Sequence, residues 1–285
     1  MGRVRLVPAL QAGLILVAVA VAACSSSGGG DDDTAAPTTT TTPSATTSST
    51  QEADACETRV PLLIELHGYS EIASGHESVV RWEPFAEEHG FVVITPQATG
   101  DPPHWDLDGD VATIEGIIDD AVADPAQCID ADRVYLSGFS MGAFLISHAV
   151  CELADKVAAV APVAGVRSVD CAPSRPVPAI IIHGNADDTV LFDGGLTPVA
   201  AEATAQPADG PSIPAIAHDW ATRNGCADAP PTDEVEGSIT TSTWSCPPGA
   251  DVELVVVDGG AHAWPTSANQ RIWDFFSRQS LARGA

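Results

Sequence analysis

Short apolar runs and segments with helical periodicity follow one another from about residue 61 to the C-terminal end of the chain. Six short runs rich in valine, isoleucine and leucine predict strands, because buried parallel strands are continuously apolar. These runs lie at 61–66, 91–95, 133–137, 157–162, 179–183 and 252–257. Segments with helical periodicity predict helices at 81–88, 110–123, 141–154, 214–224 and 268–282. The order indicates an α/β fold: a doubly wound, mainly parallel sheet with helices on both faces.

The first 55 residues do not share this pattern. Two arginines precede an apolar stretch that ends in small residues before Cys24, which is typical of a bacterial lipoprotein signal peptide over residues 1–23. Cys24 is then the expected lipidation site. The alternatives are an ordinary cleaved signal with an incidental cysteine, or a single membrane anchor. Residues 24–55 are rich in Ser, Thr, Gly, Asp and Pro and predict a disordered tether. Residues 56–285 are long enough for one α/β domain with a full core.

Composition excludes several classes of function. The formal net charge of the chain is -27, which opposes binding to nucleic acid. The same charge discourages attraction to anionic lipid, so contact with a membrane is expected through the lipid anchor only. Lys156 is the single lysine and follows a predicted helix in a surface turn, which disfavours Schiff-base and Ser–Lys mechanisms. We find no glycine-rich dinucleotide or phosphate loop and no Cys-x-x-Cys pair, so we expect neither an organic cofactor nor a metal.

Besides Cys24 the chain has six cysteines, at positions 56, 128, 151, 171, 226 and 246. An even number in an exported chain favours disulfides, and six cysteines allow fifteen pairings.

The pentapeptide Gly138-Phe-Ser-Met-Gly142 lies where a predicted strand passes into a predicted helix. This arrangement is typical of a nucleophile elbow, in which Ser140 is exposed near a helix N-terminus whose partial positive charge favours an oxyanion. The pattern is weak by itself, since a serine between two glycines also suits an ordinary tight turn. The remaining motifs of the chain favour the nucleophile.

A serine nucleophile needs a base and a carboxylate that orients the base, and in hydrolases with this elbow they follow in the order acid, then histidine. Asp187 follows the strand at 179–183, and His262 follows the strand at 252–257 in a glycine-rich loop. Asp188 is the alternative acid, although we interpret it as a solvated turn residue. The predicted triad is therefore Ser140, Asp187 and His262.

Two backbone N–H groups are needed to bind the oxyanion. Met141, the residue after the nucleophile, is expected to supply one. Tyr69 is expected to supply the other, with Gly68 as the second choice, because both lie in a loop directly after the strand at 61–66. The alternative interpretation of this loop is an ordinary turn that ends a strand.

The chain resembles the secreted serine esterases that include polyhydroxybutyrate depolymerases and feruloyl or acetylxylan esterases, particularly their bacterial lipoprotein members. The resemblance extends from Leu62 to the C-terminal end. It rests on the motifs at 66–69 (Leu-His-Gly-Tyr), 128–142, 157–165, 183–190 (His-Gly-Asn-Ala-Asp-Asp-Thr-Val), 220–226 and 259–265 (Gly-Gly-Ala-His-Ala-Trp-Pro). It implies an α/β-hydrolase fold and esterase chemistry without a cofactor, with Ser140, Asp187 and His262 in the family's catalytic positions.

The resemblance also favours disulfides Cys128–Cys151 and Cys226–Cys246, which leaves Cys56–Cys171. The usual fold of the family opens with an antiparallel hairpin. Here only residues 56–61 separate the first strand from the predicted tether, so we expect a sheet that begins about two strands late. Such a sheet leaves one edge exposed.

The sequence thus leads to the hypothesis of an exported serine esterase, on the extracytoplasmic side of the envelope or extracellular, that acts on a small or oligomeric ester. Trp264, two residues after the base, and Trp105, in a proline-rich loop, are candidates for an aromatic substrate wall or for core packing. Two alternatives remain: a serine peptidase of the prolyl-oligopeptidase type, and a non-catalytic envelope lipoprotein that keeps the scaffold for binding.

Overall fold

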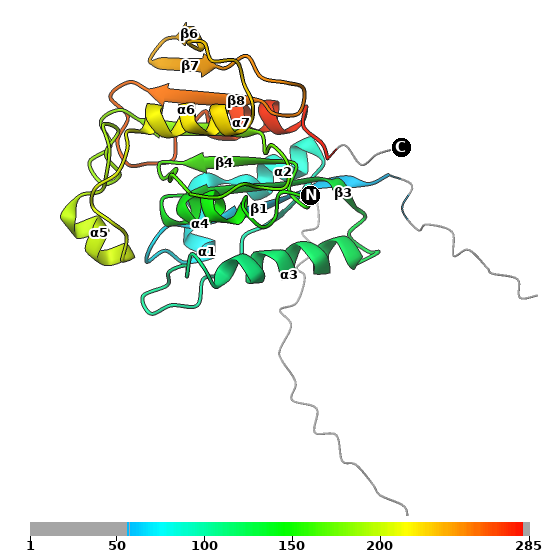
Figure 1. Cartoon of the computed structure of the whole chain (residues 1–285). Helices are drawn as coiled ribbons and strands as arrows, with labels where there is room; N and C mark the ends of the chain where they lie inside the picture. Colours follow the sequence, from blue (N-terminus) through cyan, green and yellow to red (C-terminus); the bar gives the residue numbers. More distant parts are fainter. Residues whose placement is uncertain (1–55, 57, 282–285) are drawn as a thin grey trace, which may run out of the picture. The chain divides into compact units, whose positions relative to one another are not determined.

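A computed structural model describes residue 56 and residues 58–281. In this part of the chain eight strands form one sheet in the order β2-β1-β3-β4-β5-β8-β7-β6 (Figure 1). The strands are β1 Val60–Leu66, β2 Val92–Ile94, β3 Ile129–Phe139, β4 Ala159–Val163, β5 Ala179–Gly184, β6 Thr232–Glu236, β7 Ile239–Thr243 and β8 Val252–Val257. The adjacent strands β2, β1, β3, β4, β5 and β8 are parallel, while β7 pairs antiparallel with both β8 and β6. The carboxyl ends of the parallel strands therefore meet at one rim.

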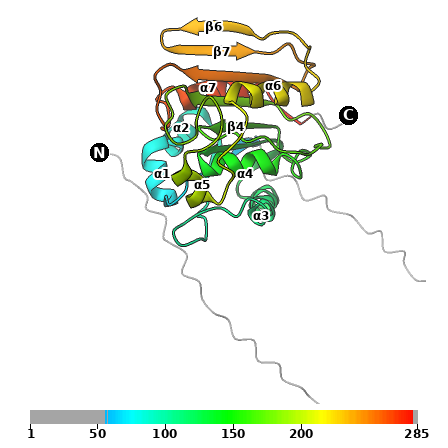
Figure 2. The ribbon, with the colours of Figure 1, turned by 60° about the vertical axis from the view of Figure 1, so that its left-hand side comes forward.

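Helices cover both faces of the sheet (Figures 1 and 2). They are α1 Ala73–Val80, α2 Trp82–His89, α3 Asp110–Ala123, α4 Met141–Ala149, α5 Pro198–Thr204, α6 Ile213–Arg223 and α7 Ala268–Phe276. One buried cluster joins α3, α4 and α6 to the sheet, and a second joins α1, α2 and α7 to the opposite face. The predicted doubly wound α/β class is confirmed.

Strand β1 illustrates how the sequence assigns side chains to the two layers. Leu62, Ile64 and Leu66 belong to the cluster with α3, α4 and α6, while Leu63 belongs to the cluster with α2 and α7. Successive side chains of a strand point to opposite faces, so Glu65 faces the α1, α2 and α7 layer together with Leu63. Glu65 is fully buried, so a carboxyl group occupies a core position there.

The six predicted strands and five predicted helices are present, with shorter helices in two places. Helix α4 ends at Ala149 rather than near 154, and α7 ends at Phe276 rather than near 282. The sequence did not predict α1, α5, or the hairpin of β6 and β7. Both hairpin strands are largely polar, and β6 is exposed along its whole length while β7 is mostly half-buried, so they lack the apolar signal on which strand prediction relies.

The edge formed by β2 lies beside β1, and in the described part of the chain no hairpin precedes β1. The late start of the sheet is therefore observed for these residues. The hairpin of β6 and β7 extends the sheet at its other edge (Figure 1).

Three disulfides are present among the described residues: Cys56–Cys128, Cys151–Cys171 and Cys226–Cys246. Only the third agrees with the expected pairing, and the expected Cys128–Cys151 and Cys56–Cys171 bridges are wrong. Cys128 directly precedes β3 and Cys56 lies shortly before β1, its parallel neighbour, where Val60 lies opposite Ile129. The two cysteines therefore meet at the amino ends of these strands.

The second bridge follows from the path of residues 164–178, which join β4 to β5 without a helix. Near its start, the Arg167 N–H donates to Ser147 Oγ in α4, and near its end Arg175 donates to carbonyls just beyond that helix. Cys171 is consequently carried past the end of α4, next to Cys151.

The predicted signal peptide (1–23), lipidation site (Cys24) and tether (24–55) lie outside the described residues and stay predictions. Among the residues that the structure describes, none of the helices has the length and apolar character needed to cross a bilayer.

Candidate active site

Ser140 lies in the sharp turn between β3 and α4, with a φ of 53° and a ψ of -114°. A positive φ in a residue other than glycine is strained, and such strain is found where the surrounding structure fixes it. The Ser140 N–H donates to the Val163 carbonyl of β4 at 3.0 Å. A Cβ atom on Gly142 would collide with the Leu66 carbonyl, so the helix after the turn can approach β1 only because that residue is glycine.

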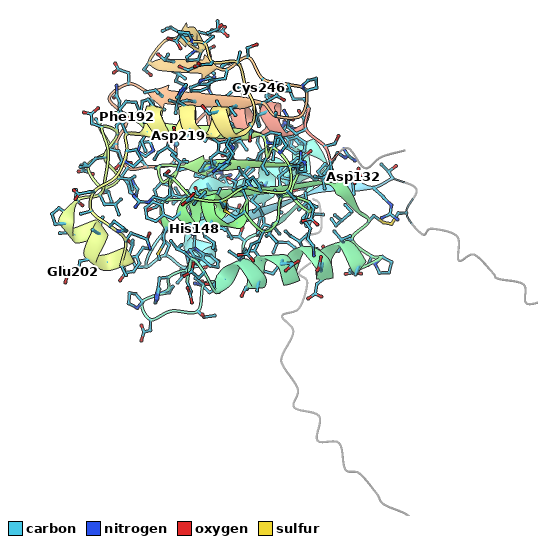
Figure 3. The ribbon with its side chains drawn as sticks, viewed as in Figure 1. Asp132, His148, Phe192, Glu202, Asp219 and Cys246 are labelled. Atoms are coloured by element: carbon cyan, nitrogen blue, oxygen red, sulfur yellow. A yellow bond between two sulfur atoms is a disulfide. The ribbon has the colours of Figure 1, made fainter. Side chains whose placement is uncertain are left out.

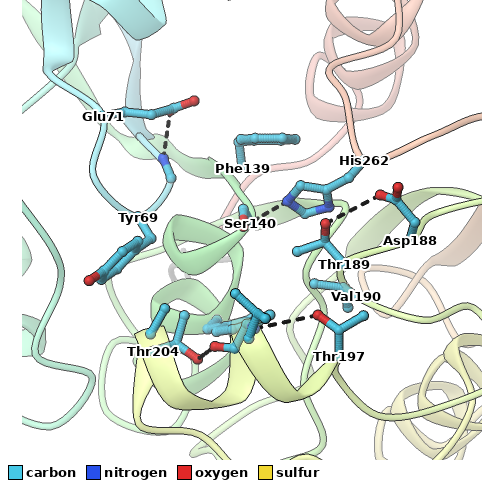
Figure 4. Close-up of a pocket in the computed structure, with 15 residues that line it drawn as sticks. Tyr69, Glu71, Phe139, Ser140, Asp188, Thr189, Val190, Thr197, Thr204 and His262 are labelled. Atoms are coloured by element: carbon cyan, nitrogen blue, oxygen red, sulfur yellow. Dashed lines mark hydrogen bonds between the residues drawn. The ribbon is translucent and has the colours of Figure 1, made fainter.

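The three predicted triad residues meet at the rim formed by the carboxyl ends of the strands. His262 Nε2 lies 3.0 Å from Ser140 Oγ, and His262 Nδ1 lies 2.8 Å from Asp187 Oδ2. Asp187 is 5% exposed, whereas Asp188 is exposed and accepts a hydrogen bond from the Thr189 hydroxyl at 3.4 Å. The geometry therefore favours Asp187 over Asp188 as the partner of His262. Figure 4 shows the Ser140–His262 hydrogen bond and Asp188 turned toward Thr189.

Several donors surround the Asp187 carboxylate. Its Oδ1 accepts the N–H groups of Thr189 and Val190, each at 2.9 Å. His183 Nε2 donates to the Val190 carbonyl at 2.9 Å and also lies 3.3 Å from Asp187 Oδ2. Burial alone raises the pKa of Asp187, but the hydrogen bonds from His183 and His262 outweigh burial and hold that pKa well below its usual range. Asp187 is thus an anion that can orient His262.

Asn185 links the two loops that carry Asp187 and His262, a role that the sequence analysis missed. Its side-chain amide donates to Asp258 Oδ1 at 2.9 Å and accepts the Gly259 N–H at 2.7 Å. The Ala186 N–H also donates to the Gly260 carbonyl at 2.9 Å. Asn185 lies within the motif at 183–190, and this position beside the acid was the only available signal.

The loop after β1 places Tyr69 at the same rim. The Gly68 N–H donates to Glu71 Oε2 at 2.8 Å. This N–H is therefore already engaged, which disfavours Gly68, the second choice, as an oxyanion donor. Within the described residues, no hydrogen bond to a protein acceptor is found for the N–H of Tyr69 or of Met141. Both N–H groups remain available for a substrate oxygen.

A cavity of about 600 Å³ contains Ser140 and His262 (Figure 4). Its lining is largely apolar and includes Phe139, Phe144, Val190, Val199 and Ala200. Four residues of α5 line it, and α5 lies beyond the rim of the sheet in Figure 1. Glu202, labelled in Figure 3, is an exposed residue of the same helix that does not line the cavity. The cavity has the size and apolar character of a small-molecule site.

The two candidate tryptophans lie elsewhere. Trp105 is 2% exposed, and its Nε1 donates to the His67 carbonyl at 2.7 Å, so it supports the loop after β1 from within the core. Trp264 lines a separate hollow beside α1 and α2, where its Nε1 donates to Asn269. Neither lines the Ser140 cavity, and the expectation of an aromatic wall from these two residues is wrong because both pack against structural partners.

Other candidate chemistry is not concentrated at this rim. Lys156 is paired with Asp119 and Glu115 at the surface. No cluster of His, Cys, Asp and Glu suited to a metal occurs among the described residues.

Two curated proteins resemble this chain over most of its described domain. The bifunctional acetylxylan esterase/xylanase of Neocallimastix patriciarum is 30% identical over 231 residues, which cover 78% of this chain and 31% of that protein. Feruloyl esterase B of Piromyces equi is 30% identical over 235 residues, which cover 78% of this chain and 42% of that protein. The chain therefore spans less than half the length of either relative.

The solved structure of an acetyl xylan esterase from Aspergillus awamori matches with a TM-score of 0.58 and 18% identity, and the match covers 79% of this chain and 90% of that one. No protein-family model matches the chain. The relatives confirm the resemblance to acetylxylan and feruloyl esterases that the motifs indicated, and the solved structure confirms the α/β-hydrolase fold.

Proposed function

We propose that this chain, a relative of the acetylxylan and feruloyl esterases, hydrolyses carboxylic esters through an acyl-enzyme. The proposal rests on the continuous hydrogen-bonded series from Ser140 Oγ through His262 to Asp187, at the mouth of an apolar cavity. A serine hydroxyl becomes a nucleophile when an oriented imidazole can take its proton, and this series supplies that arrangement.

In the proposed reaction, His262 Nε2 removes the proton of Ser140 while Oγ attacks the ester carbonyl. The N–H groups of Tyr69 and Met141 hold the negative oxygen of the tetrahedral intermediate. His262 then donates its proton to the leaving alcohol, and an acyl-Ser140 ester remains. Water, deprotonated by His262, then attacks this ester. As the C–Oγ bond breaks and the acid leaves, His262 returns the proton to Ser140 Oγ, while Asp187 keeps the Nδ1 proton of His262 in place throughout.

The cavity favours esters with an apolar acyl or alcohol group. Glu71 and Asp188 line it, and its lining has no lysine or arginine among the described residues, so a neutral ester fits better than one that also carries a carboxylate. We propose a small or oligomeric ester as the natural substrate class, within the range from acetyl and feruloyl esters to hydroxyalkanoate oligomers.

We also propose that the protein acts outside the cytoplasm. Three disulfides support export, because such bridges persist in oxidising compartments. The lipoprotein signal and Cys24 add the prediction of attachment to the envelope, which mass spectrometry of the mature N-terminus tests directly.

Labelling with a fluorophosphonate probe tests the catalytic proposal. The wild-type protein should be modified at Ser140, and Ser140→Ala should not react, while Ser78→Ala, at an exposed serine of α1, should react normally. Turnover of p-nitrophenyl butyrate by the same samples separates the alternatives. A folded wild type without turnover or labelling would favour a non-catalytic binding protein, and turnover of proline-containing peptides instead of esters would favour a peptidase.

A further inference from the structure

A buried acid–histidine–acid series lies behind the loop that carries Tyr69. His76 Nε2 is 2.8 Å from Glu65 Oε1, and His76 Nδ1 is 3.0 Å from Glu71 Oε2. Trp82 Nε1 donates to the second oxygen of Glu65 at 2.9 Å. Glu65 and Trp82 are fully buried and His76 is 3% exposed. The series therefore runs from the core of the α1 and α2 layer outward to Glu71.

An isolated charge in such a place would be costly, so buried charges are retained where partners satisfy them. Both ring nitrogens of His76 face a carboxyl oxygen, an arrangement that suits an imidazolium with two N–H donors. Burial lowers the pKa of His76, but its hydrogen bonds to Glu65 and Glu71 outweigh burial and raise it to about 9. The titratable groups that face His76 are Glu65 on β1, His67 and Glu71 in the loop after it, and Glu77 on α1.

Glu71 closes the turn that holds Tyr69. Its carboxylate accepts the Gly68 N–H at 2.8 Å, and its own N–H lies 3.3 Å from the Gly68 carbonyl. Ser70, between Tyr69 and Glu71, has a φ of 60° and donates its N–H to Pro103. Tyr69 thus lies between Gly68 and Ser70, whose N–H groups are both hydrogen-bonded. Figure 4 shows the hydrogen bond from Glu71 to the backbone beside Tyr69.

Glu71 also differs from the rest of the series in its position. It lines the Ser140 cavity, and its side chain is 37% exposed, whereas His76 and Glu65 are closed off from solvent. Burial raises the pKa of Glu71, yet the hydrogen bonds from His76 and from the Gly68 N–H hold that pKa below its usual range. Glu71 is therefore a carboxylate that the core holds at the edge of the site.

We infer that Glu71 is a positioning residue for ester hydrolysis: held by the buried His76 and Glu65, it fixes the Gly68–Glu71 turn so that the Tyr69 N–H points at the oxyanion. This inference rests on the proposed function. Because the oxyanion forms only in the transition state, loss of Glu71 should lower kcat and leave substrate binding nearly unchanged.

Three substitutions of Glu71 separate the effect of the length of its side chain from the effect of its charge. Glu71→Ala removes the acceptor of the Gly68 N–H and should reduce kcat by about 10- to 100-fold, below the roughly 10²- to 10³-fold loss of a whole oxyanion donor. KM should stay within about threefold. Glu71→Gln keeps one side-chain oxygen that can accept from both Gly68 and His76, so it should restore most of the activity. Glu71→Asp keeps the charge but retracts it by one methylene, so it should be impaired like Glu71→Ala.

The rate of labelling by the fluorophosphonate probe should follow kcat across these variants, because the phosphonyl oxygen occupies the oxyanion position. Glu87→Gln, at an exposed glutamate of α2, is the matched control and should behave as wild type. A wild-type kcat in Glu71→Ala, a loss seen in KM instead of kcat, or an active Glu71→Asp beside an impaired Glu71→Gln would each overturn the inference. Failure of the proposed function is distinct, since the wild type itself would then neither turn over esters nor label at Ser140.

Discussion

Replacement of Asp187 by asparagine tests the proposed mechanism most directly. Two backbone N–H groups donate to Oδ1, so the amide oxygen of the introduced asparagine should take that place. The amide NH2 group then faces His262 Nδ1 in the position of Oδ2, which is 2.8 Å away in the wild type. Two donors cannot share that contact, so the imidazole should shift its proton to Nε2 and lose the ability to deprotonate Ser140.

The expected loss is large. When the acid of a Ser-His-Asp triad is changed to the amide, the histidine keeps its place in the wrong tautomer and kcat falls by about 10⁴-fold. A decrease of this size corresponds to about 5.4 kcal/mol of lost transition-state stabilisation. Steady-state hydrolysis of p-nitrophenyl butyrate measures it, and a thermal unfolding curve for each variant verifies that the protein remains folded.

Asp188→Asn is the matched comparison, because it makes the same change one residue further along, at an exposed carboxylate that lines the cavity but is hydrogen-bonded to Thr189 and not to His262. We expect it to retain most of the wild-type activity. The reasoning is refuted if folded Asp187→Asn keeps kcat within tenfold of the wild type, or if Asp188→Asn is the variant that loses activity.

Three further outcomes follow from the cavity, the first disulfide and the buried imidazole. Ala203→Trp should lower kcat/KM for p-nitrophenyl octanoate relative to acetate by at least about tenfold, because Ala203 lines the cavity. Glu202→Trp, one residue earlier in α5 and outside the cavity lining, should leave this ratio unchanged. Serine at both Cys56 and Cys128 should lower the free energy of unfolding, measured in urea, by about 4 kcal/mol, because this bridge joins cysteines 72 residues apart. Removal of either other bridge, each with a separation of 20 residues, should cost about 3 kcal/mol. Equal losses for all three bridges would contradict the chain-entropy argument. The pKa of His76 is about 9 in the folded protein, above its unfolded value of about 6.5. The stability of the wild type relative to His76→Gln should therefore be greatest below pH 6.5 and decline toward pH 9. A difference in Tm that does not change with pH would exclude the charged imidazole.

The meeting of Ser140, Asp187 and His262 could be predicted because each residue follows the carboxyl end of a parallel strand. In a doubly wound sheet these ends share one rim, so sequence order and strand prediction together fix the rough position of each side chain. The choice of Asp187 over Asp188 needed only the expectation that one of two adjacent turn acids is solvated. The structure agrees, since Asp187 is buried and Asp188 is exposed.

Features that depend on the path of irregular segments could not be predicted. The Cys151–Cys171 bridge exists because residues 164–178 return along α4, and these residues carry no periodic signal. Trp105 and Trp264 were ambiguous for a similar reason, as their loops determine whether an indole faces the core or the cavity. Glu65 did give a signal, a single carboxyl group within an apolar strand, but its partner His76 lies on a helix that the sequence pattern does not reveal.

The Cys56–Cys128 bridge has a mechanical consequence. β3 lies between β1 and β4, inside the sheet, so the bridge ties the entry point of the fold to an interior strand by a covalent link. A tensile load that arrives through the chain before Cys56 then passes directly into β3 and does not pull on the ladder of β1 alone. The loop of Tyr69, at the opposite end of β1, is thereby shielded from tension at the point where the chain enters the domain.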